Sequence, residues 1–152
     1  MVIRAHSFVE DRASGALNID NSTKFAEANL SYLTKTFGSS GDRRTWTYST
    51  WVKRNLRDRE ALFSAGASPN ASFGIEFQAN GAVGEEELYL YDYSSSSGFL
   101  WVLRTQDYFT DVCGWYHIVL VFNTTESTNT DRIKLYINNK RITNWNSSPS
   151  AS

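Results

Sequence analysis

Residues 45–54, TWTYSTWVKR, decide the fold class of this chain. Trp46 and Tyr48 stand between hydroxyl residues, and this period of two is typical of a β-strand with one buried face. Residues 115–122, WYHIVLVF, are apolar almost throughout, which is typical of a strand covered on both faces. Aromatic and β-branched side chains fit a pleated sheet and crowd a helix. We therefore expect these two segments to be the central strands of a β-sandwich.

The same strand pattern recurs along the chain. Turn-forming clusters such as 38–42 and 94–98 separate the apolar segments, and no amphipathic helix pattern is present. About nine short strands are predicted, over residues 32–36, 45–54, 61–66, 73–78, 88–91, 99–104, 115–122, 132–137 and 141–145. The chain is therefore predicted to be all-β.

The composition fits one globular domain and argues against several partner classes. The chain has 152 residues, of which 41% are hydrophobic and 14% are aromatic, which is enough for one core. Its formal net charge is -1 without a basic block, so we expect no nucleic-acid partner. No apolar run reaches about 18 residues and no apolar segment follows a positive start, so we expect neither membrane insertion nor a signal peptide.

Three regions are predicted along the chain. Residues 1–20 form an extended arm, whose candidate attachment residues are Ile3, Phe8 and Leu17. Two interpretations of the arm stay open: attachment to a neighbouring subunit by strand addition, and a frayed terminus. Residues 21–145 form the sandwich, and residues 146–152 form a disordered polar tail.

Six motifs point to a known family when they are taken together and in order. They are YLTKT (32–36), GDRRTWT (41–47), WVKR (51–54), LFSAG (62–66), GWYHIV (114–119) and DRIKLYIN (131–138). This set resembles the laminin-G-like, or concanavalin A-like, jelly-roll modules of structural proteins of marine tailed bacteriophages, cyanophages among them. The resemblance covers roughly residues 20–145 and implies an antiparallel two-sheet β-sandwich.

The resemblance also implies a set of core residues. Trp51 and Trp115 are expected to point inward from facing sheets as large anchors. Strict alternation puts Trp51 on the other face of the strand from Trp46 and Tyr48. Its inward placement therefore requires a bulge or a strand covered on both faces. The further core residues predicted are Phe63, Phe77, Ile118 and Leu135.

Two departures from the family pattern carry expectations of their own. The family often turns its last hairpin with Asn-Gly, whereas this chain has Asn138-Asn139-Lys140, so we expect a wider turn. Family members continue past the position of Trp145 with further strands. Two expectations follow and stay open: a longer native chain that supplies the further strands, or a sandwich that is incomplete at its C-terminal end, with an open edge covered by the arm or by a partner's strand.

A row of aromatic residues is the candidate binding site. Tyr89, Tyr91 and Tyr93 share one face of a regular strand, opposite Leu88 and Leu90. Together with Trp101 and Tyr108 they offer stacking rings for a sugar, and contiguous exposed rings mark a binding surface. The alternative is ordinary cross-strand aromatic packing.

The titratable residues give no catalytic pattern. Glu85, Glu86 and Glu87 are consecutive and lack the spacing of a glycosidase pair, even with Asp92 nearby, so we expect a solvated loop. The two histidines, His6 and His117, are far apart, and no nucleophile elbow accompanies them. Cys113, the single cysteine, is predicted to be a small buried thiol rather than a nucleophile.

No cofactor or metal is predicted, although the resemblance keeps calcium open. Calcium needs several oxygen ligands, and Asp107, Asp111 and Asp131 are scattered along the chain.

The function expected from the resemblance is that of a non-enzymatic bacteriophage virion protein. It is a small capsid decoration module on the particle surface, with the major capsid protein or another virion protein as its partner and adhesion to cell-surface glycans as its contribution. Three alternatives stay open: a segment of a tail fibre or receptor-binding protein, a free carbohydrate-binding module, and a jelly-roll glycoside hydrolase.

Overall fold

A computed structural model describes residues 23–25, 31–54, 59–68, 71–79 and 86–146. Residues 1–40 and 41–152 are separate compact units. In the first unit, residues 23–25 and 31–40 form no helix or strand, so the strand predicted over 32–36 is wrong. The predicted arm, with Ile3, Phe8 and Leu17, and residues 147–152 of the predicted tail lie outside the described residues.

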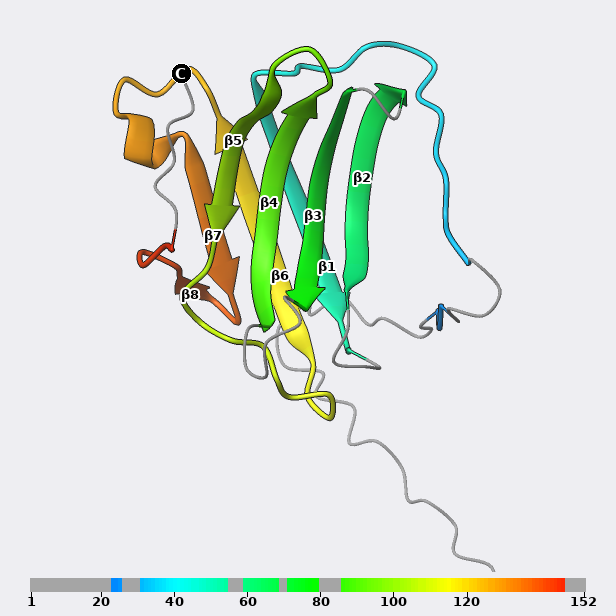
Figure 1. Ribbon diagram of the computed structural model, residues 1–152, viewed down its shortest axis with the longest axis vertical. Coiled ribbons are helices and arrows are strands. Elements are labelled where there is room, and N and C mark those ends of the chain that lie inside the picture. Colours follow the sequence, from blue (N-terminus) through cyan, green and yellow to red (C-terminus); the bar gives the residue numbers. More distant parts are fainter. Residues whose placement is uncertain (1–22, 26–30, 55–58, 69–70, 80–85, 147–152) are drawn as a thin grey trace, which may run out of the picture. The chain divides into compact units, whose positions relative to one another are not determined.

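The second unit is a β-sandwich of two four-stranded antiparallel sheets, which confirms the predicted fold class (Figure 1). Sheet A has the order β1-β6-β7-β8, and sheet B has the order β2-β3-β4-β5. The strands of sheet A are β1 (Thr45–Val52), β6 (Tyr116–Asn123), β7 (Ile133–Ile137) and β8 (Lys140–Arg141). Those of sheet B are β2 (Glu60–Ser68), β3 (Ala71–Ala79), β4 (Glu86–Ser94) and β5 (Gly98–Arg104). A 3-10 turn, η2 (Asn129–Asp131), precedes β7.

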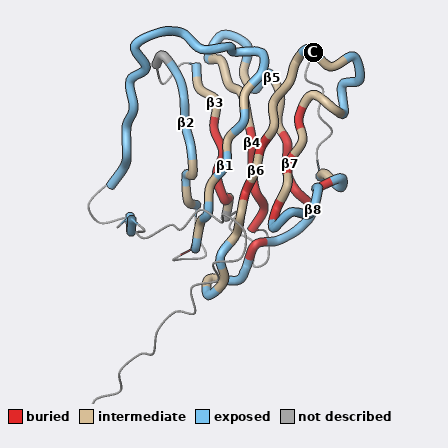
Figure 2. The backbone as a smooth tube through the Cα atoms, turned by 180° about the vertical axis from the view of Figure 1, so that it is seen from behind, coloured by how far each residue is buried: buried red, intermediate tan, exposed pale blue. Residues whose placement is uncertain are grey.

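The core lies between the sheets and is built from alternate residues of the inner strands, which are the most buried parts of the chain (Figure 2). Phe77, Ile118 and Leu135 belong to it, as predicted. Strand β6 is nearly all apolar, yet it buries only Ile118 and Leu120 fully. The prediction that β6 is covered on both faces is therefore wrong. Its outward-facing valines, Val119 and Val121, are only partly buried.

The two tryptophans predicted as core anchors are exposed. Strand β1 pairs with β6 in an unbroken register without a bulge, so alternation turns Trp51 outward and leaves it 53% exposed. Trp115 lies just before β6 and is 50% exposed. Phe63, also predicted for the core, is exposed instead, because it lies on the edge strand β2, where it contacts the rings of Tyr48 and Phe73.

The two sheets are linked differently along the two sides of the sandwich. After β8 the chain crosses to β5, where Thr105 and Trp145 form a β-bridge and the Asn146 N–H donates to the Arg104 carbonyl at 2.8 Å. On the opposite side, β1 and β2 are edge strands, and no other described strand pairs with their free edges. There the Tyr48 hydroxyl donates to the Leu62 carbonyl at 3.3 Å.

The hairpin between β7 and β8 is tight, so the expectation of a wider turn is wrong. Ile137 pairs directly with Lys140, which leaves a loop of two residues. Asn138 and Asn139 have φ values of 49° and 64°. Positive φ at both positions is the geometry of a type I′ turn, and asparagine adopts it more readily than other non-glycine residues.

Candidate functional site

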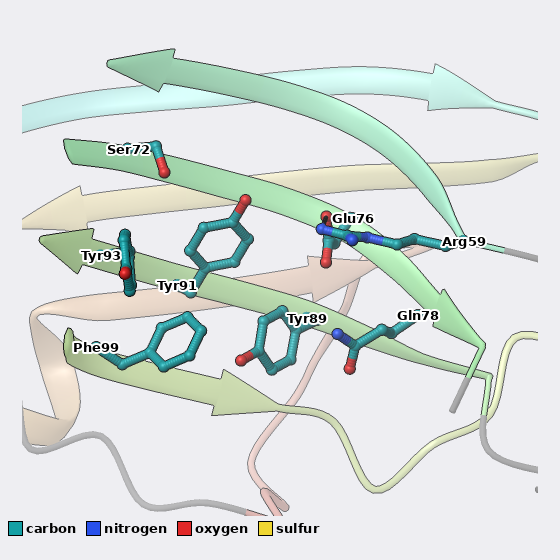
Figure 3. A pocket seen from close by; sticks show the side chains of 8 residues that line it. All are labelled: Arg59, Ser72, Glu76, Gln78, Tyr89, Tyr91, Tyr93 and Phe99. Atoms are coloured by element: carbon teal, nitrogen blue, oxygen red, sulfur yellow. Dashed lines mark hydrogen bonds and ion pairs between the residues drawn. The ribbon is translucent and has the colours of Figure 1, made fainter. Parts of the chain in front are cut away.

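Four aromatic rings line the outer face of sheet B (Figure 3). Leu88 and Leu90 of β4 are buried in the core, so alternation turns Tyr89, Tyr91 and Tyr93 to the other face of the sheet. Tyr89 is only 9% exposed, and Tyr91 and Tyr93 are partly buried, so these three rings are covered by their neighbours rather than fully exposed as predicted. Phe99 of β5 is paired with Tyr93 and joins them. These four residues are called the tyrosine face below. They line a shallow pocket of about 340 Å³ together with Arg59, Ser72, Glu76 and Gln78.

The rings of the tyrosine face hold one another in place. The ring centroids of Tyr89 and Tyr91 are 5.4 Å apart in a tilted arrangement. Phe99 meets Tyr91 and Tyr93 edge to face, at 5.8 Å and 5.2 Å. Such pairs contribute about 0.5–1.5 kcal/mol beyond the area that they bury. The face is therefore a set of preorganised rings rather than separate mobile side chains.

Each tyrosine lies opposite a residue of β3 that leaves room or supplies a polar group. The register pairs Tyr89 with Glu76, Tyr91 with Gly74 and Tyr93 with Ser72. A Cβ atom at Gly74 would lie 2.4 Å from the ring of Tyr91. The absence of a side chain at Gly74 thus lets the Tyr91 ring lie across β3.

Glu76 is the buried charge of the pocket. It is 3% exposed, and its Oε2 accepts a hydrogen bond from Arg59 Nη2 at 2.9 Å. This hydrogen bond, and then the negative charge of Glu76, raise the pKa of Arg59 above its ordinary value. The second oxygen, Oε1, is buried and has no hydrogen-bond partner among the described residues. A buried acceptor without a partner costs about 1–3 kcal/mol, so a donor at this position would be stabilising.

Two of the five residues predicted for binding lie apart from the pocket lining. Trp101 points inward, against the prediction of an exposed ring, because it shares the inner side of β5 with Leu103. Its ring lies 5.8 Å from Phe73 and 6.2 Å from Phe122. Tyr108 is exposed in the loop after β5 but does not line the pocket.

Sequence reasoning missed the other members of the pocket. The alternation of Ile75 and Phe77 already puts Glu76 on the outside of β3, and that signal could have found it. Phe99 and Gly74 can be assigned to the pocket only once it is known which residues of β3 and β5 pair with β4. Arg59 precedes β2, and the sequence carries no periodic signal for its place.

The acidic cluster is not a solvated loop, which corrects the prediction for Glu86 and Glu87. Both residues lie on β4 and are buried. Glu86 Oε2 accepts a hydrogen bond from Arg54 Nη1 at 2.7 Å, and Glu87 Oε2 accepts one from Arg104 Nε at 2.6 Å. The charged side chains are buried because each has an arginine partner. Glu85 lies outside the described residues.

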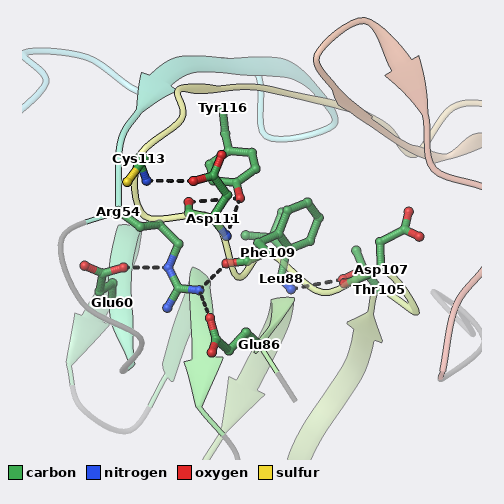
Figure 4. A network of polar contacts seen from close by, with 10 residues as sticks. All are labelled: Arg54, Glu60, Glu86, Leu88, Thr105, Asp107, Phe109, Asp111, Cys113 and Tyr116. Carbon is green, nitrogen blue, oxygen red and sulfur yellow. Dashed lines mark hydrogen bonds and ion pairs between the residues drawn. The ribbon is translucent and has the colours of Figure 1, made fainter. Parts of the chain in front are cut away.

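Arg54 is the centre of a buried polar network at one end of the sandwich (Figure 4). It is 1% exposed and also donates to Glu60 Oε2 at 2.8 Å and to the Phe109 carbonyl at 2.5 Å. The guanidinium lies 4.6 Å from the centroid of the Phe77 ring. The network ties the end of β1 to β2, to β4 and to the loop after β5, so its role is structural.

The remaining candidate residues are dispersed. His117 stacks on Trp51 at 4.6 Å on the outer face of sheet A, with Nε2 3.2 Å from Ser49 Oγ, while His6 lies outside the described residues. Cys113 is exposed, so the prediction of a buried thiol is wrong. Its loop is instead organised by Asp111, whose Oδ1 accepts hydrogen bonds from the N–H groups of Cys113 and Gly114.

No metal centre is found within the described ranges, since no three His, Cys, Asp or Glu residues there are grouped to hold an ion. Asp131 pairs with Arg141 at 2.9 Å, and Asp107 uses its backbone carbonyl to accept a hydrogen bond from Thr105. The part of the chain that the structure describes also contains no helix long and apolar enough to cross a membrane.

Comparison of the chain with protein-family models, with curated proteins and with solved structures found no match. The class that the fold defines is an all-β protein with a two-sheet, jelly-roll-like sandwich. The site on it is a polar-aromatic pocket on the outer face of sheet B.

Proposed function

We propose that this chain is a non-enzymatic, glycan-binding module displayed on a bacteriophage particle. The observation that carries the glycan part is the tyrosine face with its polar neighbours on one side of sheet B. Sugars have apolar faces that pack on aromatic rings and hydroxyl groups that need hydrogen-bond partners. The virion setting, as a capsid decoration protein, rests on the resemblance of the sequence motifs.

The carboxylates of the molecule support binding without hydrolysis. Retaining glycosidases use two carboxyl groups about 5–5.5 Å apart, one of which is free to transfer a proton. In this chain Glu76, Glu86 and Glu87 each form an ion pair with an arginine. Glu86 and Glu87 are also successive residues of one strand, so their side chains leave opposite faces of the sheet.

The glycan part is tested on a glycan array, with the wild-type chain compared with Tyr91→Ala. We expect the wild type to bind a defined group of glycans and the variant to lose about tenfold in affinity. Stacking of a nucleic-acid base on one aromatic ring contributes about 1–3 kcal/mol, and we expect the same order of magnitude for a sugar ring. Tyr108→Ala, at an exposed ring outside the pocket, is the matched control and should bind normally. Release of shorter sugars from a bound glycan would instead favour the hydrolase alternative.

The virion part is tested by co-sedimentation of the purified chain with empty capsids and, separately, with tail assemblies. We expect binding to capsids, and loss of this binding when residues 1–20 are deleted. Binding only to tails would favour the tail-fibre alternative. Glycan binding without attachment to either particle would favour a free carbohydrate-binding module.

A further inference from the structure

We infer that Glu76 is the specificity determinant of the tyrosine face: its Oε1 accepts a hydrogen bond from a hydroxyl of an uncharged sugar that packs on Tyr89 and Tyr91. This inference rests on the proposed glycan-binding function. It adds a named acceptor atom and a ligand class, neutral sugars, to a surface that aromatic stacking alone would leave unselective.

One carboxylate oxygen of Glu76, Oε1, has no hydrogen-bond partner among the described residues. Arg59 is bound through Oε2, and no donor of the described residues reaches Oε1. The side chain of Glu76 is only 4% exposed, although it lies on the outer side of the sheet, because the rings and Arg59 surround it. Polar atoms buried to this extent almost always have a partner. A ligand hydroxyl in the pocket would supply the missing donor.

Glu76 lies next to the aromatic rings of the pocket. It is paired across the strands with Tyr89, and the next outward residues of β3 on either side are Gly74, beneath Tyr91, and Gln78. Figure 3 shows the carboxylate beside the rings of Tyr89 and Tyr91. Tyr89 is only 9% exposed and Tyr91 is partly buried, so a sugar ring would pack mainly on Tyr91 and against the edge of Tyr89. Its own edge, where the hydroxyl groups lie, would then face Oε1 and the Gln78 amide.

The charges in the pocket favour neutral sugars over acidic ones. Arg59 and Glu76 neutralise each other as a pair at 2.9 Å, so the pair carries no net charge. A uronic or sialic acid carboxylate near Oε1 would meet a like charge, which costs free energy in a partly dehydrated site. A neutral hydroxyl forms a charge-assisted hydrogen bond there, which is stronger than a neutral one.

The test measures affinity by calorimetry for neutral hexose trisaccharides, for the matching uronic acid trisaccharides and for single-deoxy analogues of the best neutral binder. The wild type should prefer the neutral sugars, and one deoxy analogue should bind about tenfold or more weakly, as expected for loss of a hydrogen bond to a charged group. Glu76→Gln should lose a similar factor for the parent sugar, and that deoxy analogue should then lose nothing further. Equal wild-type affinity for neutral and uronic sugars would overturn the inference even if Glu76→Gln did not fold.

Controls separate this inference from the function on which it rests. Arg59→Gln keeps the carboxylate and should keep the preference for neutral sugars, and the melting temperature of each variant reports its folding. If Tyr91→Ala abolishes binding while folded Glu76→Gln binds as the wild type does, the glycan-binding function stands and the role of Glu76 is refuted. If the wild type binds no sugar, the proposed function itself fails.

Discussion

Gly74 fixes the place of the Tyr91 ring in the tyrosine face. A methyl group at position 74 would lie 2.4 Å from that ring, closer than two carbon atoms can approach. Because the obstructing atoms belong to the end of a side chain, the ring can swing away and the strand can persist. A Gly→Ala change in a strand also removes an entropic cost of about 0.5–1 kcal/mol.

We therefore expect Gly74→Ala to keep its melting temperature within a few degrees of the wild type and to lose about tenfold or more in glycan affinity, as when a stacking ring is lost. Both are measured on the same preparation. Gly41→Ala is the matched control, because a Cβ atom there meets nothing within 4 Å. Unchanged affinity in Gly74→Ala would mean that the position of the Tyr91 ring is unimportant for binding.

Asp92 is a carboxyl group on the inner side of β4, in register with Phe73 and Trp101. Partial burial raises its pKa above the ordinary value of 3.8. The folded state therefore favours the protonated form. The stability that this group contributes is fully present below pH 3.8 and is lost as the pH rises through the raised folded pKa.

Asp92→Asn carries no charge at any pH, so we expect it to be more stable than the wild type at pH 7. The difference should shrink as the pH falls toward 4, where the wild-type carboxyl becomes protonated. Urea unfolding of both chains between pH 4 and pH 7 measures this. A gain in stability that is the same at every pH would show that the charge of Asp92 is not its cause.

At the scale of the elements, the Arg54 network joins strands that are distant in sequence. Arg54→Met would remove the cation that pairs with the buried Glu86 at 2.7 Å, and breaking a buried pair in this way costs about 3–5 kcal/mol. Glu86→Gln in the same chain should recover part of the loss, because the buried side chain is then neutral. The free energy of unfolding in urea is the measurement.

Arg141→Met is the control for the network, since Arg141 pairs with Asp131 at the surface and both are about 40% exposed. Exposed pairs contribute about 0–1 kcal/mol. Equal losses in Arg54→Met and Arg141→Met would mean that burial of the Arg54 network adds nothing to its effect.

For the whole molecule, alternation along the strands was enough to predict the sandwich and the shared side of Tyr89, Tyr91 and Tyr93. The errors arose where another cue replaced alternation. The family resemblance predicts that Trp51 points inward, whereas alternation along β1 puts it on the face opposite Trp46. The structure agrees with the alternation. Glu86 was expected in solvent because acidic runs usually are, while its partner Arg54 lies 32 residues away in the sequence.

The site could be predicted only in part for a related reason. The tyrosines lie on one strand, so their common face follows from local geometry. Gly74 and Glu76 belong to the site because they pair with tyrosines of β4. Arg59 belongs to it because the chain just before β2 brings its side chain to Glu76. Strand register between separate segments depends on packing of the whole sandwich, and a single sequence does not reveal it.

The sandwich has two outer faces with aromatic residues, and the proposed binding site lies on one of them. Sheet B carries the tyrosine face, while sheet A carries Trp51 stacked on His117. The most direct test is NMR titration of the isotope-labelled chain with the best neutral trisaccharide. We predict that the largest shifts in the amide and aromatic signals come from Glu76, Tyr89, Tyr91 and Phe99. Shifts centred on Trp51 and His117, with the tyrosine face unchanged, would contradict the account.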